Sequence, residues 1–173
     1  MAKLRQASAY RKIKRPYVRI SKVKSKAYIK GVPHIKVSQY DIGDGLKYPI
    51  EVQLISCGEV QIRDNALEAA RQVIVRKMES VSKTGWSGKV RVVPHHVLRL
   101  NPLATGAGAD RFQRGMSLSF GRPEGHAAQV KTGKVLFSLY VPKEKVELAK
   151  LALKKANAKL PVSCKVKVVE NKE

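Results

Sequence analysis

The sequence predicts an α+β fold, a two-layer sandwich in which two amphipathic helices cover one face of a mostly antiparallel sheet. Two apolar stripes with helical spacing lie among short segments in which apolar and polar residues alternate, as in half-buried strands. A chain of 173 residues can form such a domain without disulfides or metal. We expect residues 1–36 to form a basic, extended N-terminal arm. Residues 37–173 then form one domain with an inserted glycine-rich loop at 101–116.

The arm carries half of the net charge of +22. Residues 1–30 contain eleven Lys and Arg residues and no acidic residue, whereas the rest of the chain has 24 basic and 13 acidic residues. Apolar residues are sparse here, so the arm alone cannot bury enough surface to become ordered. We expect it to order on a polyanion, with Tyr10, Tyr17 and Tyr28 stacking on bases. The alternative is a solvated tail whose tyrosines pack on the domain.

The first half of the domain reads as strand, strand, helix and strand. Val37–Ile42 and Ile50–Cys57 are predicted strands, separated by the turn residues at 43–45. Asp64-Asn65 offers a helix N-cap, and Gly85 and Gly88 mark the end of the helical region. The strand after it is Lys89–Val93. The apolar face of this helix is predicted to comprise Leu67, Ala70, Ile74, Met78 and Val81.

The second half repeats this pattern with a strand at Val135–Val141, a helix that Pro142 opens and Pro161 stops, and an alternating strand at Val162–Val169. The stripe of this helix comprises Val146, Ala149, Leu153, Ala156 and Leu160. KVRVV after the first helix resembles KVKVV after the second. The similarity suggests two strand–helix–strand units that share one sheet, although chance similarity between short basic strands would also explain it.

The segment between the halves is rich in glycine. Six of the twelve glycines lie in residues 101–133, and Asn101–Gly115 shows neither helical nor strand periodicity. A long segment of this kind is usually functional or disordered. Its small residues allow close approach to another backbone, and Arg111, Arg114 and Arg122 suit phosphates. We expect the loop to act outside the fold; the alternative is that it packs on the sheet, with an ion pair between Asp110 and Arg111.

The motif search gives little support for catalysis. Gly106–Arg111 begins like a dinucleotide-binding fingerprint, but Arg111 replaces the third glycine and no βαβ frame follows. His95 and His96 are adjacent, so in an extended chain they point to opposite sides and are poor ligands for one metal. A structural histidine or an RNA contact fits better. Cys57 and Cys164 fit small core-filling roles in a reducing cytosol. We therefore expect no enzyme activity, cofactor or metal.

The charge points to a polyanionic partner, because a free protein gains nothing from so much self-repulsion. Nucleic acid is the first candidate. A membrane surface is the second, but the basic residues form no amphipathic helix with a wide apolar face, and no apolar run approaches ~20 residues. The rival hypotheses are a free nucleic-acid-binding module, such as a chromatin protein, and a nucleotide-dependent enzyme built on the loop Gly106–Arg111.

Five stretches carry a more specific similarity: Lys14–Tyr17, Tyr28–Pro33, Asn65–Arg71, Pro94–Arg99, and Ala104–Arg111 with Gly115-Met116. Through them the chain resembles the archaeal and eukaryotic branch of the universal L-sixteen family of large-subunit ribosomal proteins, also called the L-ten-e family. Val93 and Gln129 depart from that pattern, which has Tyr or Phe and Arg there. The departure at Gln129 puts one phosphate contact in doubt. The absence of a long C-terminal extension favours the archaeal form.

The resemblance implies an antiparallel-type sheet covered by two helices. It also implies binding to large-subunit rRNA near the peptidyl transferase centre, in the cleft that holds the tRNA acceptor arms. The loop at about Leu103–Met116 would point towards the tRNA acceptor end, and the chemistry would belong to the RNA. The expected partners are large-subunit rRNA, the tRNA acceptor arm and neighbouring ribosomal proteins, with 5S rRNA as a further candidate and no membrane. The expected location is cytoplasmic and ribosome-bound.

The candidate residues fall into two sets. The predicted rRNA-binding residues are Arg5, Arg11, Lys12, Lys14, Arg15, Tyr17, Arg19, Lys22, Lys24, Lys26, Lys30, His95, His96, Arg99 and Arg122. The predicted tRNA-proximal residues are Thr105, Gly106, Ala107, Gly108, Ala109, Asp110, Arg111 and Arg114.

Overall fold

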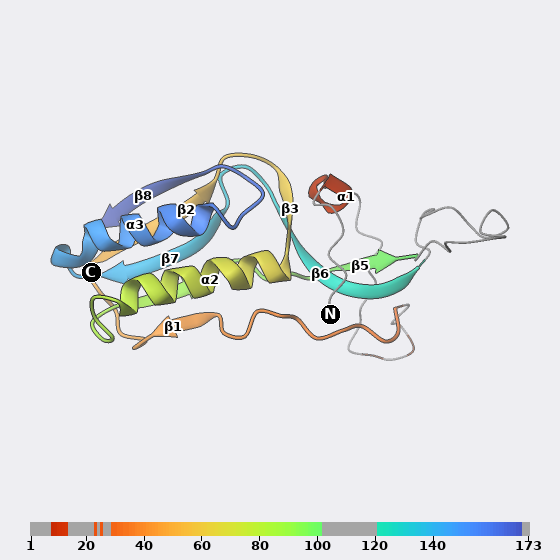
Figure 1. The fold of residues 1–173 in the computed structure, drawn as a ribbon, viewed down its shortest axis with the longest axis horizontal. Helices are drawn as coiled ribbons and strands as arrows, with labels where there is room; N and C mark the ends of the chain where they lie inside the picture. Colours follow the sequence, from red (N-terminus) through yellow and green to blue (C-terminus); the bar gives the residue numbers. More distant parts are fainter. Residues whose placement is uncertain (1–7, 14–22, 24, 26–28, 102–120, 171–173) are drawn as a thin grey trace, which may run out of the picture.

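The computed structural model describes residues 8–13, 23, 25, 29–101 and 121–170 (Figure 1). It confirms the α+β class: strands form two antiparallel sheets, and two long helices cover the larger one. In chain order the elements are α1 (Ser8–Arg11), β1 (Asp41–Gly43), β2 (Ile50–Ser56), β3 (Val60–Arg63), α2 (Asp64–Glu79), β4 (Ser87–Val90), β5 (His96–Leu100), β6 (Arg122–Val130), β7 (Val135–Val141), the 3-10 turn η3 (Lys143–Lys145), α3 (Val146–Asn157) and β8 (Cys164–Glu170).

The five-stranded sheet has the order β1-β4-β7-β2-β8. Four of these strands belong to two strand–helix–strand units, β2-α2-β4 and β7-α3-β8. The units interleave in the sheet, because β4 pairs with β7 and β8 pairs with β2. This is the split βαβ topology of ferredoxin-like folds. The helices α2 and α3 pack against each other on one face of the sheet (Figure 1). The arrangement agrees with two strand–helix–strand units that share one sheet.

The main core lies between these helices and the sheet. The stripe of α2 is buried at Leu67, Ala70, Ile74 and Met78, each with no exposed surface. Val81 was assigned to this stripe wrongly: α2 ends at Glu79, and Val81 is 65% exposed. The chain turns there because the backbone N–H groups of Val81 and Ser82 both donate to the carbonyl of Met78, which closes the last turn.

The stripe of α3 is also confirmed. Ala149, Leu153 and Ala156 have no exposed surface, and Val146 packs against the core from a partly buried position. Leu160 also packs against the core, but it lies beyond the end of α3 at Asn157. Small residues on this face let α3 approach α2 and the sheet closely. Burial of one leucine side chain such as that of Leu153 contributes about 1.5–3 kcal/mol.

The first predicted strand is mostly wrong, because only Asp41–Gly43 pairs with a neighbour. Before it, the backbone N–H of Lys36 donates to Asp64 Oδ2 at 3.2 Å, and that of Ser38 donates to Glu68 Oε2 at 3.2 Å. Carboxylates of α2 therefore occupy donors that a neighbouring strand would need. The segment runs along α2 as an extended strap instead of joining the sheet.

The strand predicted at Lys89–Val93 begins earlier, at Ser87. Gly88 belongs to this strand and does not mark the end of the helical region. A Cβ at Gly88 would lie 2.7 Å from Leu139 Cδ2 and 3.3 Å from the carbonyl oxygen of Ser138, so only glycine lets β4 pack this closely on β7.

The three-stranded sheet, of order β3-β6-β5, extends away from the helical sandwich (Figure 1). At its inner end Val60, Ile62, Ala128 and Val130 join the main core. Further out, Val97, Leu98, Leu100 and Ala127 are buried but lie outside that core cluster. The outermost pair is Leu100 with Arg122, and residues 102–120 connect these strands. We call this outer part of β5 and β6 the distal end.

Candidate nucleic-acid interface

The three-stranded sheet contacts two separate parts of the N-terminal region. On one face, α1 packs against β3: Gln61 Nε2 donates to the carbonyl of Tyr10 at 2.9 Å, and Gln129 Nε2 donates to Gln61 Oε1 at 3.1 Å. The guanidinium carbon of Arg63 lies 5.1 Å from the centroid of the Tyr10 ring. Tyr10 therefore packs on the domain, as the alternative reading held. Tyr17 and Tyr28 lie outside the described residues.

A second anchor lies at the buried side chain of His126 on β6. Its Nε2 is 2.7 Å from the carbonyl oxygen of Pro33, and because a carbonyl only accepts, Nε2 carries the proton. Residues 29–36 are thereby held against the sheet, and Lys36 is tied to α2 through Asp64. Two stretches that were predicted to belong to the arm thus contact the domain.

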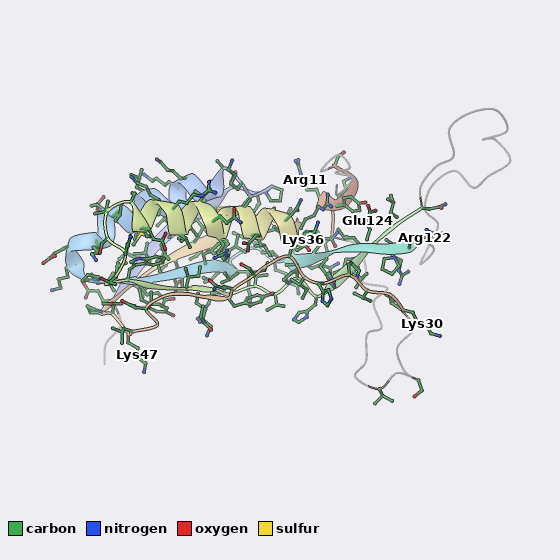
Figure 2. The ribbon with its side chains drawn as sticks, turned by 60° about the horizontal axis from the view of Figure 1, so that its bottom comes forward. Arg11, Lys30, Lys36, Lys47, Arg122 and Glu124 are labelled. Atoms are coloured by element: carbon green, nitrogen blue, oxygen red, sulfur yellow. The ribbon has the colours of Figure 1, made fainter. Side chains whose placement is uncertain are left out.

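Cations outnumber anions strongly in this region. Within residues 8–13, 29–36, 60–63, 95–101 and 121–130, the single carboxylate is Glu124, while Glu59 and Asp64 flank β3. The Lys and Arg residues there are Arg11, Lys12, Lys30, Lys36, Arg63, Arg99 and Arg122. We call these seven side chains the distal cation cluster. Lys30 and Arg122 project at the distal end, whereas Arg11 and Lys36 lie nearer the helices (Figure 2).

The adjacent histidines differ in environment. His95 is exposed, whereas His96 is half-buried at the start of β5. Burial, and then the charge of Arg99, lower the pKa of His96, so its ring is neutral at pH 7. His96, Ala127 and Arg63 lie in one row across the sheet. His96 Nδ1 and Arg63 Nε are buried and have no hydrogen-bond partner within the described part of the chain.

This arrangement suits binding to a phosphate backbone. The exposed cations at α1, Lys30 and Arg122 can each contact a phosphate without losing a protein partner recorded in the structure. Arg122 belongs to the sheet, and hydrogen bonds tie α1 and residues 29–36 to it, which lowers the ordering cost of binding.

Comparison with known proteins gives a consistent result. Residues 14–167 match the model of the family described as ribosomal protein L16p/L10e. The chain is 42% identical over 174 residues to large ribosomal subunit protein uL16 of Methanococcus maripaludis, covering 98% of this chain and 96% of the relative. It is 40% identical to the uL16 protein of Archaeoglobus fulgidus over 170 residues, with 96% and 94% covered. For Metallosphaera sedula uL16 the identity is 45% over 152 residues, with 86% and 87% covered.

The chain belongs to the ribosomal protein L16p/L10e family. The resemblance seen in the sequence is therefore confirmed, including the similarity to archaeal members.

The structure describes only part of the predicted interface of this L16p/L10e member. Arg11, Lys12, Lys30, His95 and Arg122 are exposed, and His96 and Arg99 are half-buried, all in or beside the three-stranded sheet. The remaining candidates lie outside the described residues: Arg5, Lys14, Arg15, Tyr17, Arg19, Lys22, Lys24, Lys26, Thr105, Gly106, Ala107, Gly108, Ala109, Asp110, Arg111 and Arg114.

Sequence reasoning missed Arg63, Lys36 and His126. Arg63 ends β3, a strand too short for its apolar and polar residues to show clear alternation. It also directly precedes α2, and nothing in the local sequence marks it as a binding residue. The strand β6 was not predicted at all, because Pro123 and Gly125 disfavour strands. The feature of the sequence that could have indicated these residues is the scarcity of Asp and Glu in the segments that form the three-stranded sheet, as in the arm.

The core-filling role predicted for the cysteines is wrong for Cys57, which is exposed at the end of β2. Cys164 is half-buried against the core, and burial, with a smaller effect of Cys57, raises the pKa of its thiol to about 11. Across the described ranges, no group of three His, Cys, Asp or Glu side chains is placed to hold a metal ion. Nor does any helix there have the length and apolar character needed to cross a bilayer.

Proposed function

We propose that the chain is a structural constituent of the large ribosomal subunit that binds large-subunit rRNA through the three-stranded sheet and the N-terminal arm. The observation that supports this most directly is the distal cation cluster, whose seven Lys and Arg side chains outnumber the three nearby carboxylates Glu59, Asp64 and Glu124. Family membership supports ribosomal RNA as the polyanion, since the relatives are named as proteins of the large subunit. The chain acts without catalysing a reaction.

We further propose a location for the protein in the subunit: near the peptidyl transferase centre, with the glycine-rich loop towards the tRNA acceptor arm. In support, Leu100 pairs with Arg122, so the loop leaves from the outermost point of the three-stranded sheet. Neighbouring ribosomal proteins and 5S rRNA are the remaining proposed partners.

Sedimentation tests the assignment to the ribosome. In a sucrose gradient of lysate from the source cells, the chain should travel with large subunits and whole ribosomes. It should move to the top of the gradient when high salt strips phosphate contacts. Sedimentation with chromatin, or as a free protein at low salt, would contradict the proposal and favour the rival nucleic-acid-binding module.

Deletion of Thr105–Ala109 tests the role of the loop. The melting temperature of the free protein should hardly change, because shortening a loop alters its closure entropy by only about 0.6 kcal/mol per halving of length. Reconstituted subunits should assemble but bind tRNA weakly, and Arg111→Ala should show a milder form of this defect. A lower melting temperature combined with normal tRNA binding would instead indicate a loop that packs on the sheet.

A further inference from the structure

A second site lies at the other end of the molecule from the distal cation cluster, on the face of the five-stranded sheet that α2 and α3 leave open. It is a groove of about 1180 Å³ bounded by the loop at residues 43–49 and by side chains of β2, β4 and β7. Lys47 projects from that loop at the opposite end from Arg122 (Figure 2). The groove has room for a nucleotide, and nothing in the proposed rRNA interface uses it.

Strand register defines the floor of this groove. Glu51 of β2 pairs with Tyr140 of β7, which pairs with Ser87 of β4, so these three side chains form one row. Val52 and Leu54 are fully buried beneath the helices, and the side chains of a strand alternate between faces. Glu51 therefore belongs to the open face.

The loop at residues 43–49 forms a fixed wall. The hydroxyl of Tyr48 donates to Asp44 Oδ2 at 2.6 Å, and the backbone N–H of Gly85 donates to the same oxygen at 2.9 Å. Ser87 Oγ donates to the carbonyl of Leu46 at 2.6 Å. Gly43 has φ +82°, and a Cβ there would collide with the carbonyl oxygen of Trp86, so the loop can follow this path only with glycine. The groove is thus largely formed before any ligand binds.

The buried, unpaired carboxylate of Glu51 indicates that the groove binds a ligand. The residue is only 8% exposed, and its Oε1 has no hydrogen-bond partner in the part of the chain that the structure describes. A buried acceptor without a donor costs about 1–3 kcal/mol, and more when it is charged. The cations that line the groove, Lys47, Lys89 and Arg91, are all exposed at its rim. Lys89 forms an ion pair with Asp41 at 3.2 Å.

The chemistry of the lining selects one kind of base. A carboxylate fork accepts two hydrogen bonds side by side, so it fits an edge with two adjacent donors. Among the four RNA bases only guanine presents such an edge, with N1–H beside the N2 amino group. Adenine and cytosine each place an acceptor beside their amino group, and uracil flanks its single N–H with two carbonyls. The carboxylate would repel those acceptors.

We propose that this groove binds an unpaired guanine nucleotide of RNA, with Glu51 accepting from the guanine edge, Tyr140 and Tyr48 contacting the base, and Arg91 and Lys89 contacting the flanking phosphates. The proposal rests on the proposed function only in taking RNA as the partner. By analogy, open four-stranded sheets of other proteins stack unpaired bases on aromatic residues, and Tyr140 lies on a central strand of this one.

Fluorescence anisotropy with the full chain provides the test. The probes are labelled hexauridylates in which one central uridine is replaced by guanosine, adenosine or inosine, at a salt concentration that suppresses phosphate-only binding. The wild-type chain should bind the guanosine probe ~10-fold more tightly than the adenosine probe, at the low end of what a bidentate base contact provides. Inosine lacks the N2 amino group, so its probe should bind with intermediate affinity.

Variants assign the preference to Glu51. Glu51→Gln should abolish the preference for guanosine, because it weakens the contact with the guanine edge and removes the repulsion of the adenine acceptors. Glu59→Gln, the same charge change at an exposed position outside the groove, should keep it. Arg91→Gln should weaken binding of both probes equally, and thermal melts should show each variant folded.

Two results would overturn the proposal: equal affinity of the wild-type chain for the guanosine and adenosine probes, or a guanosine preference that survives Glu51→Gln. The first result needs no variant, so it holds even if Glu51→Gln fails to fold. Failure of the proposed function would look different, because the chain would then bind neither these probes nor rRNA fragments.

Discussion

At the residue scale, Glu68 joins the strap before β1 to α2. Its carboxylate accepts from Arg71 Nη2 at 2.6 Å, from Arg71 Nε at 2.9 Å, and from the backbone N–H and hydroxyl of Ser38, both at 3.2 Å. The hydrogen bond from Arg71, opposed by burial and assisted by Ser38 and Gln72, lowers the pKa of Glu68 to about 2. One side chain therefore fixes two segments that are 30 residues apart in the sequence.

Stability at low pH should depend on Glu68. The pKa is depressed in the folded state, so the stabilisation is complete above the unfolded value of about 4.5 and is lost as pH falls towards about 2. At pH 7, Glu68→Gln should lower the free energy of unfolding by about 1–3 kcal/mol. Urea titrations of both proteins between pH 7 and pH 2 should show this gap closing. A gap that stays constant across the range would mean that the ionised carboxylate is not the stabilising form.

The two thiols should react at different rates. Cys57 is exposed, while Cys164 is half-buried with its pKa raised to about 11. Because the thiolate is the reactive form, an aromatic disulfide reagent at pH 8 should modify Cys57 at least ~10-fold faster. Stopped-flow absorbance of the wild-type chain should show two phases, and Cys57→Ser should remove the fast one. Loss of the slow phase in that variant would reverse the assignment.

The residue-level errors share one cause. Whether Tyr10 stacks on RNA or on Arg63, and whether Cys57 is buried or exposed, depends on contacts between distant parts of the chain. Local pattern contains no information on such contacts. The distal cation cluster was partly predictable, because an excess of Lys and Arg can be counted in the sequence without knowledge of tertiary contacts.

At the element scale, both long helices were predictable, whereas several short strands and β6 were not. Helical periodicity repeats over three or more turns in α2 and α3, so one misplaced residue such as Val81 hardly affects the prediction. The strands β1, β3 and β4 have three or four residues each, too few for alternation to be decisive. For β6, Pro123 wrongly indicates that no strand forms. Pro123 pairs with Arg99, where the register between β5 and β6 shifts.

Adjacent residues on α3 test the assignment of its faces. Leu153 has no exposed surface, whereas Lys154 is exposed. Leu153→Asp should lower the free energy of unfolding by at least about 3 kcal/mol, because it buries an unpaired carboxylate and removes apolar contacts. Lys154→Asp should melt within a few degrees of the wild type. Equal melting temperatures, measured by circular dichroism, would show that the face of α3 is misassigned.

At the scale of the whole molecule, the proposed rRNA interface lies apart from the main core. The main core lies between the helices and the five-stranded sheet, while the three-stranded sheet extends outward with two cation-bearing segments on it (Figures 1 and 2). The net charge of +22 predicts a polyanion but not where it binds. The location follows from packing of residues 8–13 and 29–36 on β3 and β6, which the sequence did not reveal.

The most direct test of this account is the salt dependence of binding to a large-subunit rRNA fragment. It compares the double variant Lys30→Glu/Arg122→Glu with the matched variant Lys131→Glu/Lys143→Glu, whose exposed lysines lie away from the distal end. Each lost phosphate contact should reduce the slope of log affinity against log salt by roughly 0.7–0.9. The account predicts that the distal variant loses about 1.4–1.8 and the matched variant almost nothing. Equal losses in both variants would contradict a localised rRNA-binding site at the three-stranded sheet.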